Sequence, residues 1–124
     1  MSQVANNREP DVRLIESDQE FFSKKGLLPT HWDEVRKFPR FYLRSRSEAV
    51  IYPLKSQPTT EPKACKVATS DVSRGGMSLL LPQQVFPGQR MEVIFTSGDI
   101  RTLKVVWCRR IGDRCYSAGT QFVS

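Results

Sequence analysis

The chain of 124 residues is long enough for one domain with a single modest core and too short for a second full domain. Its 39% hydrophobic and 26% charged residues are typical of a soluble globular protein, and no apolar run approaches the roughly 20 residues of a membrane-spanning helix. The N-terminus contains no apolar stretch of the kind found in signal peptides, so the sequence predicts a cytoplasmic protein.

The net charge of +6 is unevenly distributed along the chain. Residues 1–34 contain four basic and seven acidic residues, a net charge of −3, whereas the remaining residues contain fifteen basic and six acidic ones, a net charge of +9. Such a basic body favours an anionic partner, such as a nucleotide, a nucleic acid or an acidic surface. We expect an N-terminal tail with short helices in residues 1–34 and a separate β domain in residues 35–124.

Two short helices are predicted in the N-terminal part. Ser17 and Glu20 have the spacing of a capping box, and Gly26 can adopt the left-handed conformation that follows a helix. A second capping signal begins at Thr30. The helical pattern ends at Pro39, because proline cannot continue a helix and biases the preceding residue toward an extended conformation.

Beyond this proline the pattern becomes that of strands. Apolar and polar residues alternate in short runs separated by turns that contain Gly or Pro, which predicts an all-β, antiparallel sheet of six strands closed into a barrel. In the fifth run, Leu103, Val105 and Trp107 are predicted to share one face. The expected strands cover residues 41–52, 64–70, 77–81, 90–96, 100–110 and 114–123.

The sequence contains little that suggests catalysis. No histidine lies beside a plausible nucleophile, and His31 falls in the acidic N-terminal stretch. The three cysteines, Cys65, Cys108 and Cys115, are an odd number without the spacing of a zinc site, and a hairpin turn at residues 112–113 would place Cys108 opposite a serine. We therefore expect three structural thiols, no metal, no cofactor and no enzymatic activity.

Two short motifs carry the binding chemistry. Arg36 and Arg40 form an RxxxR pattern, and Asp71, Ser73 and Gly76 form a DxSxxG pattern. An arginine can bond to two phosphate oxygens or to the O6 and N7 edge of a guanine, and its plane can stack on a base. A carboxylate accepts hydrogen bonds from the N1 and N2 donors of guanine, and glycine leaves backbone room and tolerates a positive φ.

In this order the two motifs resemble those of the PilZ domain family of bacterial cyclic di-GMP receptors. The resemblance continues through "GGMSLLL", "FPGQRMEVIF", "VVW" and "AGTQF" and covers roughly residues 35–123. It implies a six-stranded PilZ-like β-barrel that binds cyclic di-GMP and signals to a protein partner. The implied ligand contacts are Arg36, Arg40, Asp71, Ser73 and Gly76, with Arg74, Lys37 and Arg44 as secondary candidates.

Structural roles compete with these assignments. Asp71 and Ser73 are also good turn formers, because their side chains bond to nearby backbone amides. The aromatic residues Phe95, Trp107 and Phe122 are assigned to the barrel core rather than to a base-stacking surface. Relatives that bind a stacked pair of ligand molecules carry a further arginine before RxxxR, and a valine stands there in this chain, which favours one ligand per domain.

Two alternative functions remain open on the sequence. One is a PilZ-like adaptor that does not bind the nucleotide, and the other, which is less favoured, is a basic β-barrel that binds RNA or single-stranded DNA through exposed aromatic and basic residues such as Phe41 and Tyr42. The sequence ends directly after the last expected strand, without the C-terminal helix of many relatives. The N-terminal helices or a second protomer in a homodimer would then cover that end of the barrel, or it would stay open.

Overall fold

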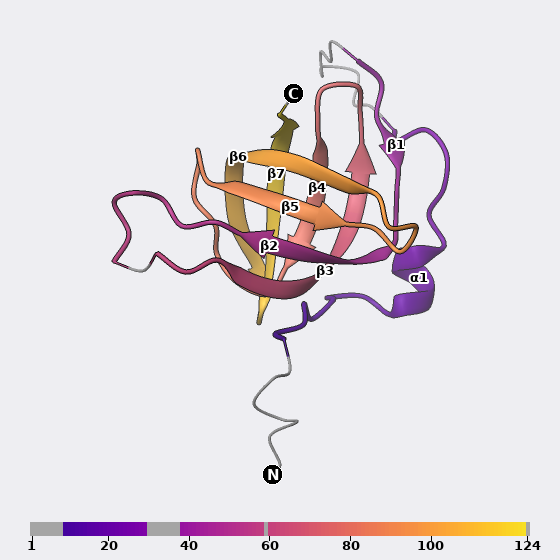
Figure 1. The fold of residues 1–124 in the computed structure, drawn as a ribbon. Helices are drawn as coiled ribbons and strands as arrows, with labels where there is room; N and C mark the ends of the chain where they lie inside the picture. Colours follow the sequence, from indigo (N-terminus) through magenta and orange to yellow (C-terminus); the bar gives the residue numbers. More distant parts are fainter. Residues whose placement is uncertain (1–8, 30–37, 59, 124) are drawn as a thin grey trace.

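The protein is described by a computed structural model that covers residues 9–29, 38–58 and 60–123. Strands β2 to β7 form a closed antiparallel barrel in the order β3–β2–β5–β6–β7–β4, which the pairing of β3 with β4 closes, and the short β1 adds to β3 (Figure 1). The predicted all-β class and six-stranded barrel are confirmed. In chain order the described elements are α1 (Asp18–Phe22), β1 (Phe41–Tyr42), β2 (Arg46–Ile51), β3 (Lys63–Val72), β4 (Met77–Leu81), β5 (Arg90–Ile94), β6 (Ile100–Gly112) and β7 (Cys115–Phe122).

The barrel interior is filled by alternating apolar side chains from all six strands. Because successive residues of a strand point to opposite faces, one apolar residue in two is enough to build this core. Burying each large side chain contributes roughly 1.5–3 kcal/mol, which makes the interior the main source of stability. The largest fully buried apolar side chains are Met77, Leu79, Leu81, Met91, Leu103, Val67, Val85, Val93 and Val105.

The single long strand predicted for residues 41–52 is broken into two. Both pieces pair with the same edge of β3, but the register changes from Tyr42 opposite Asp71 to Arg46 opposite Ala68. Four steps along this segment therefore correspond to three steps along β3, and residues 43–45 belong to neither strand. The expected first strand was wrong in continuity because the residue types at this interruption still favour a strand.

A second bulge lies in β3 at Ser70. Thr69 is paired with Leu79, whereas Asp71 is paired with Ser78, so the register against β4 shifts by one residue between them. Upstream of the bulge, alternate β3 side chains such as Val67 belong to the barrel core, and downstream of it Val72 packs against the same core. Asp71 therefore lies on the outer face, because an inserted residue reverses the side on which each later side chain lies.

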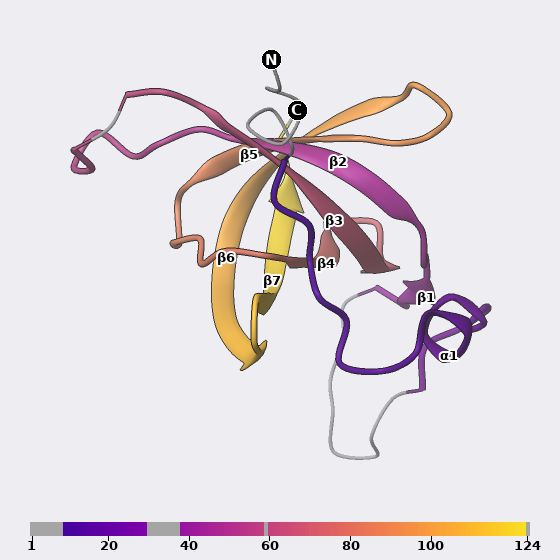
Figure 2. The ribbon, with the colours of Figure 1, turned by 90° about the horizontal axis from the view of Figure 1, so that it is seen from below.

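The N-terminal segment packs against the outside of the barrel. The backbone of Lys66 in β3 accepts a hydrogen bond from Val12 N and donates one to Pro10 O, at 3.1 and 2.7 Å. Figure 2 shows this indigo segment running past β3 to α1. A second apolar cluster lies between the N-terminal segment and the barrel. Its buried members are Val12, Phe21, Ala68, Leu80 and Cys115.

The predicted capping box begins α1. The Ser17 Oγ accepts a hydrogen bond from the Glu20 backbone N–H at 3.2 Å and donates one to the Glu20 carboxylate at 3.0 Å. The helix ends at Phe22, earlier than expected, and Gly26 has the predicted positive φ of 87° but lies beyond the helix. The second predicted helix falls on residues 30–37, which lie outside the described residues.

Within the described residues, no helix is long and apolar enough to cross a membrane. Of the three cysteines, Cys65 and Cys115 are buried and Cys108 is half-buried. The β6–β7 turn lies at residues 113–114, one position later than expected, and together with a register shift between Arg110 and Gly112 it places Cys108 opposite Ala118 instead of Ser117.

Candidate functional site

The second motif forms the turn between β3 and β4. The Ser73 backbone N–H donates to Gly76 O at 2.8 Å, and the Ser73 Oγ accepts from the Gly75 N–H at 3.4 Å. Gly75 O in turn accepts from Phe122 N on β7 at 3.0 Å. Ser73 is therefore a turn former, as its residue type predicted, and its hydroxyl stands at the mouth of the turn beside β7.

Glycine is required at position 76 because the backbone of the turn lies very close to the backbone of β7. A Cβ at this position would lie 1.9 Å from Thr120 O on β7, so the turn can pack on β7 only without a side chain. A positive φ, which we expected from the sequence, is not the reason: the described residues with positive φ include Gly26, Gly88 and Gly98 but not Gly76. Glycine here brings the β3–β4 turn against β7 and so shapes the surface between them.

Arg40 is positioned by pairing on the outer side of β1. Its backbone O accepts from Leu28 N at 2.8 Å, and Tyr42 N donates to Gly26 O at 2.8 Å. These two bonds hold residues 26–28 alongside β1. Because alternate residues of a strand share a face, Arg40 and Tyr42 lie on the outer face with Asp71, which is opposite Tyr42.

The two motifs meet in an ion pair. Arg40 Nη1 donates to Asp71 Oδ1 at 2.8 Å and to Ser78 Oγ at 3.3 Å. The Arg40 side chain is 37% exposed and that of Asp71 12%, so this charge-assisted bond is partly shielded from water. Among the described residues no acceptor pairs with the other nitrogens of the Arg40 guanidinium. The pair therefore holds the arginine in place beside the β3–β4 turn.

Arg40 lines a groove of about 250 Å³ on the outer face of the barrel, which we call the outer groove. Among the described residues, its lining contains one cation and no carboxylate, and it includes the glycines of the turn together with the exposed face of β6 and β7. Such a lining suits an anionic ligand with a flat surface. The lining residues are Arg40, Ser73, Gly75, Gly76, Val106, Trp107, Gly119, Thr120 and Gln121.

Trp107 belongs to this groove and not to the core, which corrects the sequence prediction. A register shift between Val105 and Trp107 moves the indole to the outer face, where it is 40% exposed. The indole lies directly against the backbone of Gly119, so that a Cβ there would meet ring atoms. The Arg109 guanidinium stands 5.7 Å from the ring centre. Phe122, in contrast, packs against the core as predicted.

The sequence contained only a partial signal for these residues. A glycine at position 119 in the interior of a strand marks a close approach of another group, and that group is the indole. The bulge that exposes Trp107 left no signal, because its residues are ordinary strand formers. Ser78, which supports Arg40, was likewise read only as part of a strand.

The secondary candidates lie elsewhere or outside the described residues. Arg44 does not line the outer groove, and its guanidinium packs between Phe21 and Tyr42. Arg74 stands over the Phe38 ring at 5.4 Å, at the end of the barrel. Arg36 and Lys37 fall on residues 30–37, so the first arginine of RxxxR cannot be placed relative to Arg40.

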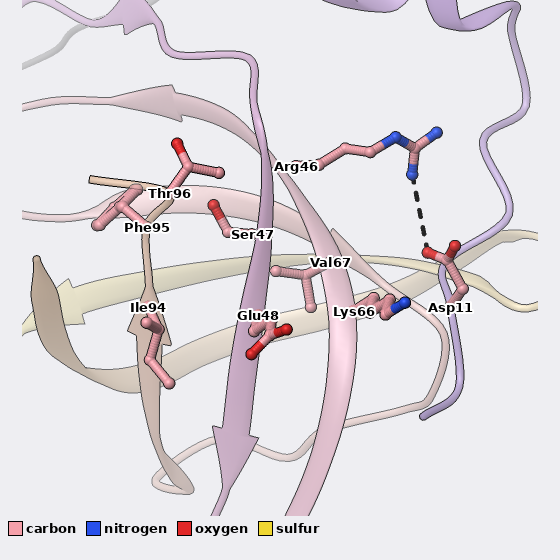
Figure 3. A pocket seen from close by; sticks show the side chains of 9 residues that line it. All are labelled: Asp11, Arg46, Ser47, Glu48, Lys66, Val67, Ile94, Phe95 and Thr96. Atoms are coloured by element: carbon pink, nitrogen blue, oxygen red, sulfur yellow. Dashed lines mark ion pairs between the residues drawn. The ribbon is translucent and has the colours of Figure 1, made fainter. Parts of the chain in front are cut away.

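Two larger hollows lie elsewhere on the molecule. One of about 590 Å³ lies at the end of the barrel, where apolar residues such as Met77 and Phe122 are joined by charged and polar ones: Ser73, Arg74, Asp99 and Arg101. The other, of about 450 Å³, lies between the N-terminal segment and strands β2, β3 and β5 (Figure 3). There Arg46 extends toward Asp11 at 3.7 Å, and the remaining lining has a further cation and carboxylate, so the charges balance.

Comparison with known proteins agrees with this geometry. Residues 34–124 match the PilZ domain, whereas none of the curated proteins matches the chain. The match covers most of the chain and includes both motifs and every strand of the barrel. The paired arginine and aspartate on the outside of a closed six-stranded barrel, together with this match, show that the chain belongs to the PilZ domain family.

Proposed function

We propose that this protein is a non-catalytic cytoplasmic receptor for cyclic di-GMP that binds the dinucleotide in the outer groove. The observation that carries the proposal is the Arg40–Asp71 ion pair, which joins the two motifs of the family at 2.8 Å on the edge of a groove with a cationic lining. Cyclic di-GMP has two phosphates and two guanines, and the groove offers a guanidinium fork, a hydroxyl and an indole for them.

The residues of the two motifs and Trp107 have proposed roles. Arg40 bonds to a phosphate or to the O6 and N7 edge of a guanine, and Arg36 approaches the same ligand from the preceding segment. Asp71 orients Arg40 and accepts hydrogen bonds from the guanine N1 and N2 donors. Trp107 stacks on a base, since base–aromatic stacking contributes about 1–3 kcal/mol per base. The backbone at Gly76 leaves room for the ligand beside the Ser73 hydroxyl.

Binding passes a signal through the N-terminal part. Arg40 directly precedes β1, and residues 26–28 pair with its backbone, so a ligand that pulls on this arginine acts on the segment that follows α1. A ligand can shift this segment only by its different affinity for the two arrangements. The resulting change of the N-terminal surface is what a protein partner would recognise.

Isothermal titration calorimetry of the purified chain with cyclic di-GMP tests the proposal. We expect saturable binding that Arg40→Ala weakens by at least 100-fold, because the substitution removes the groove's cation and leaves the largely buried Asp71 unpaired. Arg13→Ala is the matched control: it removes the same charge from a side chain that is 66% exposed and is paired with Asp113 away from the groove. Equal affinity of the two variants would refute the assigned site.

Two rival functions make different predictions in the same experiment. An adaptor without ligand binding would give no heat at millimolar cyclic di-GMP. A nucleic-acid-binding barrel would bind a random oligonucleotide with a steep salt dependence, and that binding would survive Asp71→Ala.

A further inference from the structure

Arg44 is an arginine with an unusually buried charge. Its side chain is 13% exposed, whereas the Arg46 side chain two residues later is 46% exposed. Long cationic side chains normally keep the charged group in water, and burial is tolerated when the charge is paired and hydrogen-bonded. The contacts of this guanidinium therefore indicate a specific role.

These contacts reach two different parts of the molecule. On one side, Arg44 Nη1 donates to Phe21 O in α1 at 3.4 Å, its guanidinium stands 4.1 Å from the Phe21 ring centre, and Glu16 lies 3.8 Å away. On the other side, Arg44 Nε donates to Ser70 O at 3.0 Å, and the guanidinium lies 5.0 Å from the centre of the Tyr42 ring. One side chain thus connects α1 to β1 and β3.

The β3 contact falls on the bulge that orients the groove. The register shift around Ser70 places Asp71 on the outer face, and the same carbonyl also accepts from Leu43 N at 3.0 Å. Tyr42 lies directly opposite Asp71, the partner of Arg40. Whatever holds the Ser70 carbonyl and the Tyr42 ring in place therefore helps to hold the Arg40–Asp71 pair.

We propose that Arg44 is a positioning residue that couples the docking of α1 to nucleotide binding in the outer groove. When α1 leaves the barrel, Arg44 loses the Phe21 ring, the Phe21 carbonyl and Glu16, and its bond to Ser70 becomes exposed to water. The docked arrangement therefore binds the nucleotide more tightly. By thermodynamic reciprocity, the nucleotide stabilises the docking of α1, and a partner that captures α1 weakens nucleotide binding. This inference rests on the proposed function.

Arg46 supplies a matched control. Its guanidinium also attaches to the N-terminal part, with Asp18 at 2.6 Å and Asp11 at 3.7 Å, the latter drawn in Figure 3, and it stands over the Phe22 ring at 5.3 Å. Its hydrogen bonds and ion pairs in the described structure do not include the Ser70 carbonyl. Losing Arg46 therefore removes exposed ion pairs, which contribute little to the docking of α1, and leaves the contacts at the bulge unchanged.

The test is a double-mutant cycle measured by calorimetry with cyclic di-GMP on the full chain. We expect Arg44→Met to raise Kd about 10-fold, within the usual range of coupling between sites. Phe21→Leu keeps an apolar side chain and removes the ring face, so it should also raise Kd, but it should add nothing in the Arg44→Met background. Arg46→Met should stay within about twofold of the wild type. Fully additive effects of Phe21→Leu and Arg44→Met would overturn the coupling.

Hydrogen exchange gives a readout that a merely structural role of Arg44 would not change. Saturating cyclic di-GMP should slow exchange in residues 17–23 of the wild type and of Arg46→Met, but not of Arg44→Met. If saturating cyclic di-GMP leaves the hydrogen-exchange rates of residues 17–23 unchanged in the wild type, the proposal is overturned.

If the protein does not bind cyclic di-GMP, the proposed function is refuted, but the coupling through Arg44 can still be tested. Without ligand, Arg44→Met and Phe21→Leu should both speed exchange in residues 69–72, because both release the bulge at Ser70. If Phe21→Leu affects only residues 17–23, α1 and the bulge are not coupled through Arg44.

Discussion

Gly76→Ala tests the packing that brings the β3–β4 turn against β7. The added Cβ would lie 1.9 Å from Thr120 O, more than an ångström inside the 3.0 Å limit that Cβ contacts respect, and 2.9 Å from Thr120 C. These are backbone atoms in a paired strand, so the turn must move away by about 1 Å and give up the bond from Phe122 N to Gly75 O. Overpacking of this kind costs about 3 kcal/mol.

The variant next to it is a direct control. A Cβ at Gly75 meets nothing within 4 Å, and this residue has no positive φ, so Gly75→Ala should be neutral or stabilising by about 0.5 kcal/mol through the unfolded state. Thermal unfolding followed by circular dichroism should show Gly76→Ala melting about 10 °C or more below the wild type and Gly75→Ala at or slightly above it. Equal melting temperatures for the two variants would refute the reasoning.

Two further substitutions test the groove and the core. Gly119→Ala should displace the Trp107 indole at a stability cost of about 1 kcal/mol, since a side chain moves more easily than backbone. It should weaken cyclic di-GMP binding at least fivefold by calorimetry, and unchanged affinity would exclude the indole from the site. In β3, burial and the nearby carboxylates of Glu9 and Asp11 raise the pKa of Cys65 from 9.0 to about 12. Between these values the unfolded chain loses this proton and the folded chain keeps it, so the unfolding free energy falls as pH rises above 9. Urea titrations at pH 8 and 10.5 should show a smaller decrease in the unfolding free energy for Cys65→Ala than for the wild type. An equal decrease would contradict the raised pKa of Cys65.

Local chemistry in the sequence was sufficient to predict most of the described elements. The capping box at Ser17 and the alternation of apolar residues in β4 to β7 depend on neighbours a few residues away, so they can be read directly from the chain. Arg40 and Asp71 were recognised as members of one site from the order of their motifs. Their contact joins residues 31 apart, and only the pairing of β1 with β3 brings them within 2.8 Å.

Irregularities in the strand pairing decided what the sequence could not. An interruption at residues 43–45 broke the expected first strand, the bulge at Ser70 placed Asp71 outside the barrel, and the bulge before Trp107 moved an expected core residue into the groove. A bulge adds a single residue and reverses the face of every side chain after it, yet its residues have ordinary strand propensities. Composition and spacing therefore determined that this chain is a barrel with arginine and aspartate motifs, and the tertiary register alone determined which side chains face the outer groove.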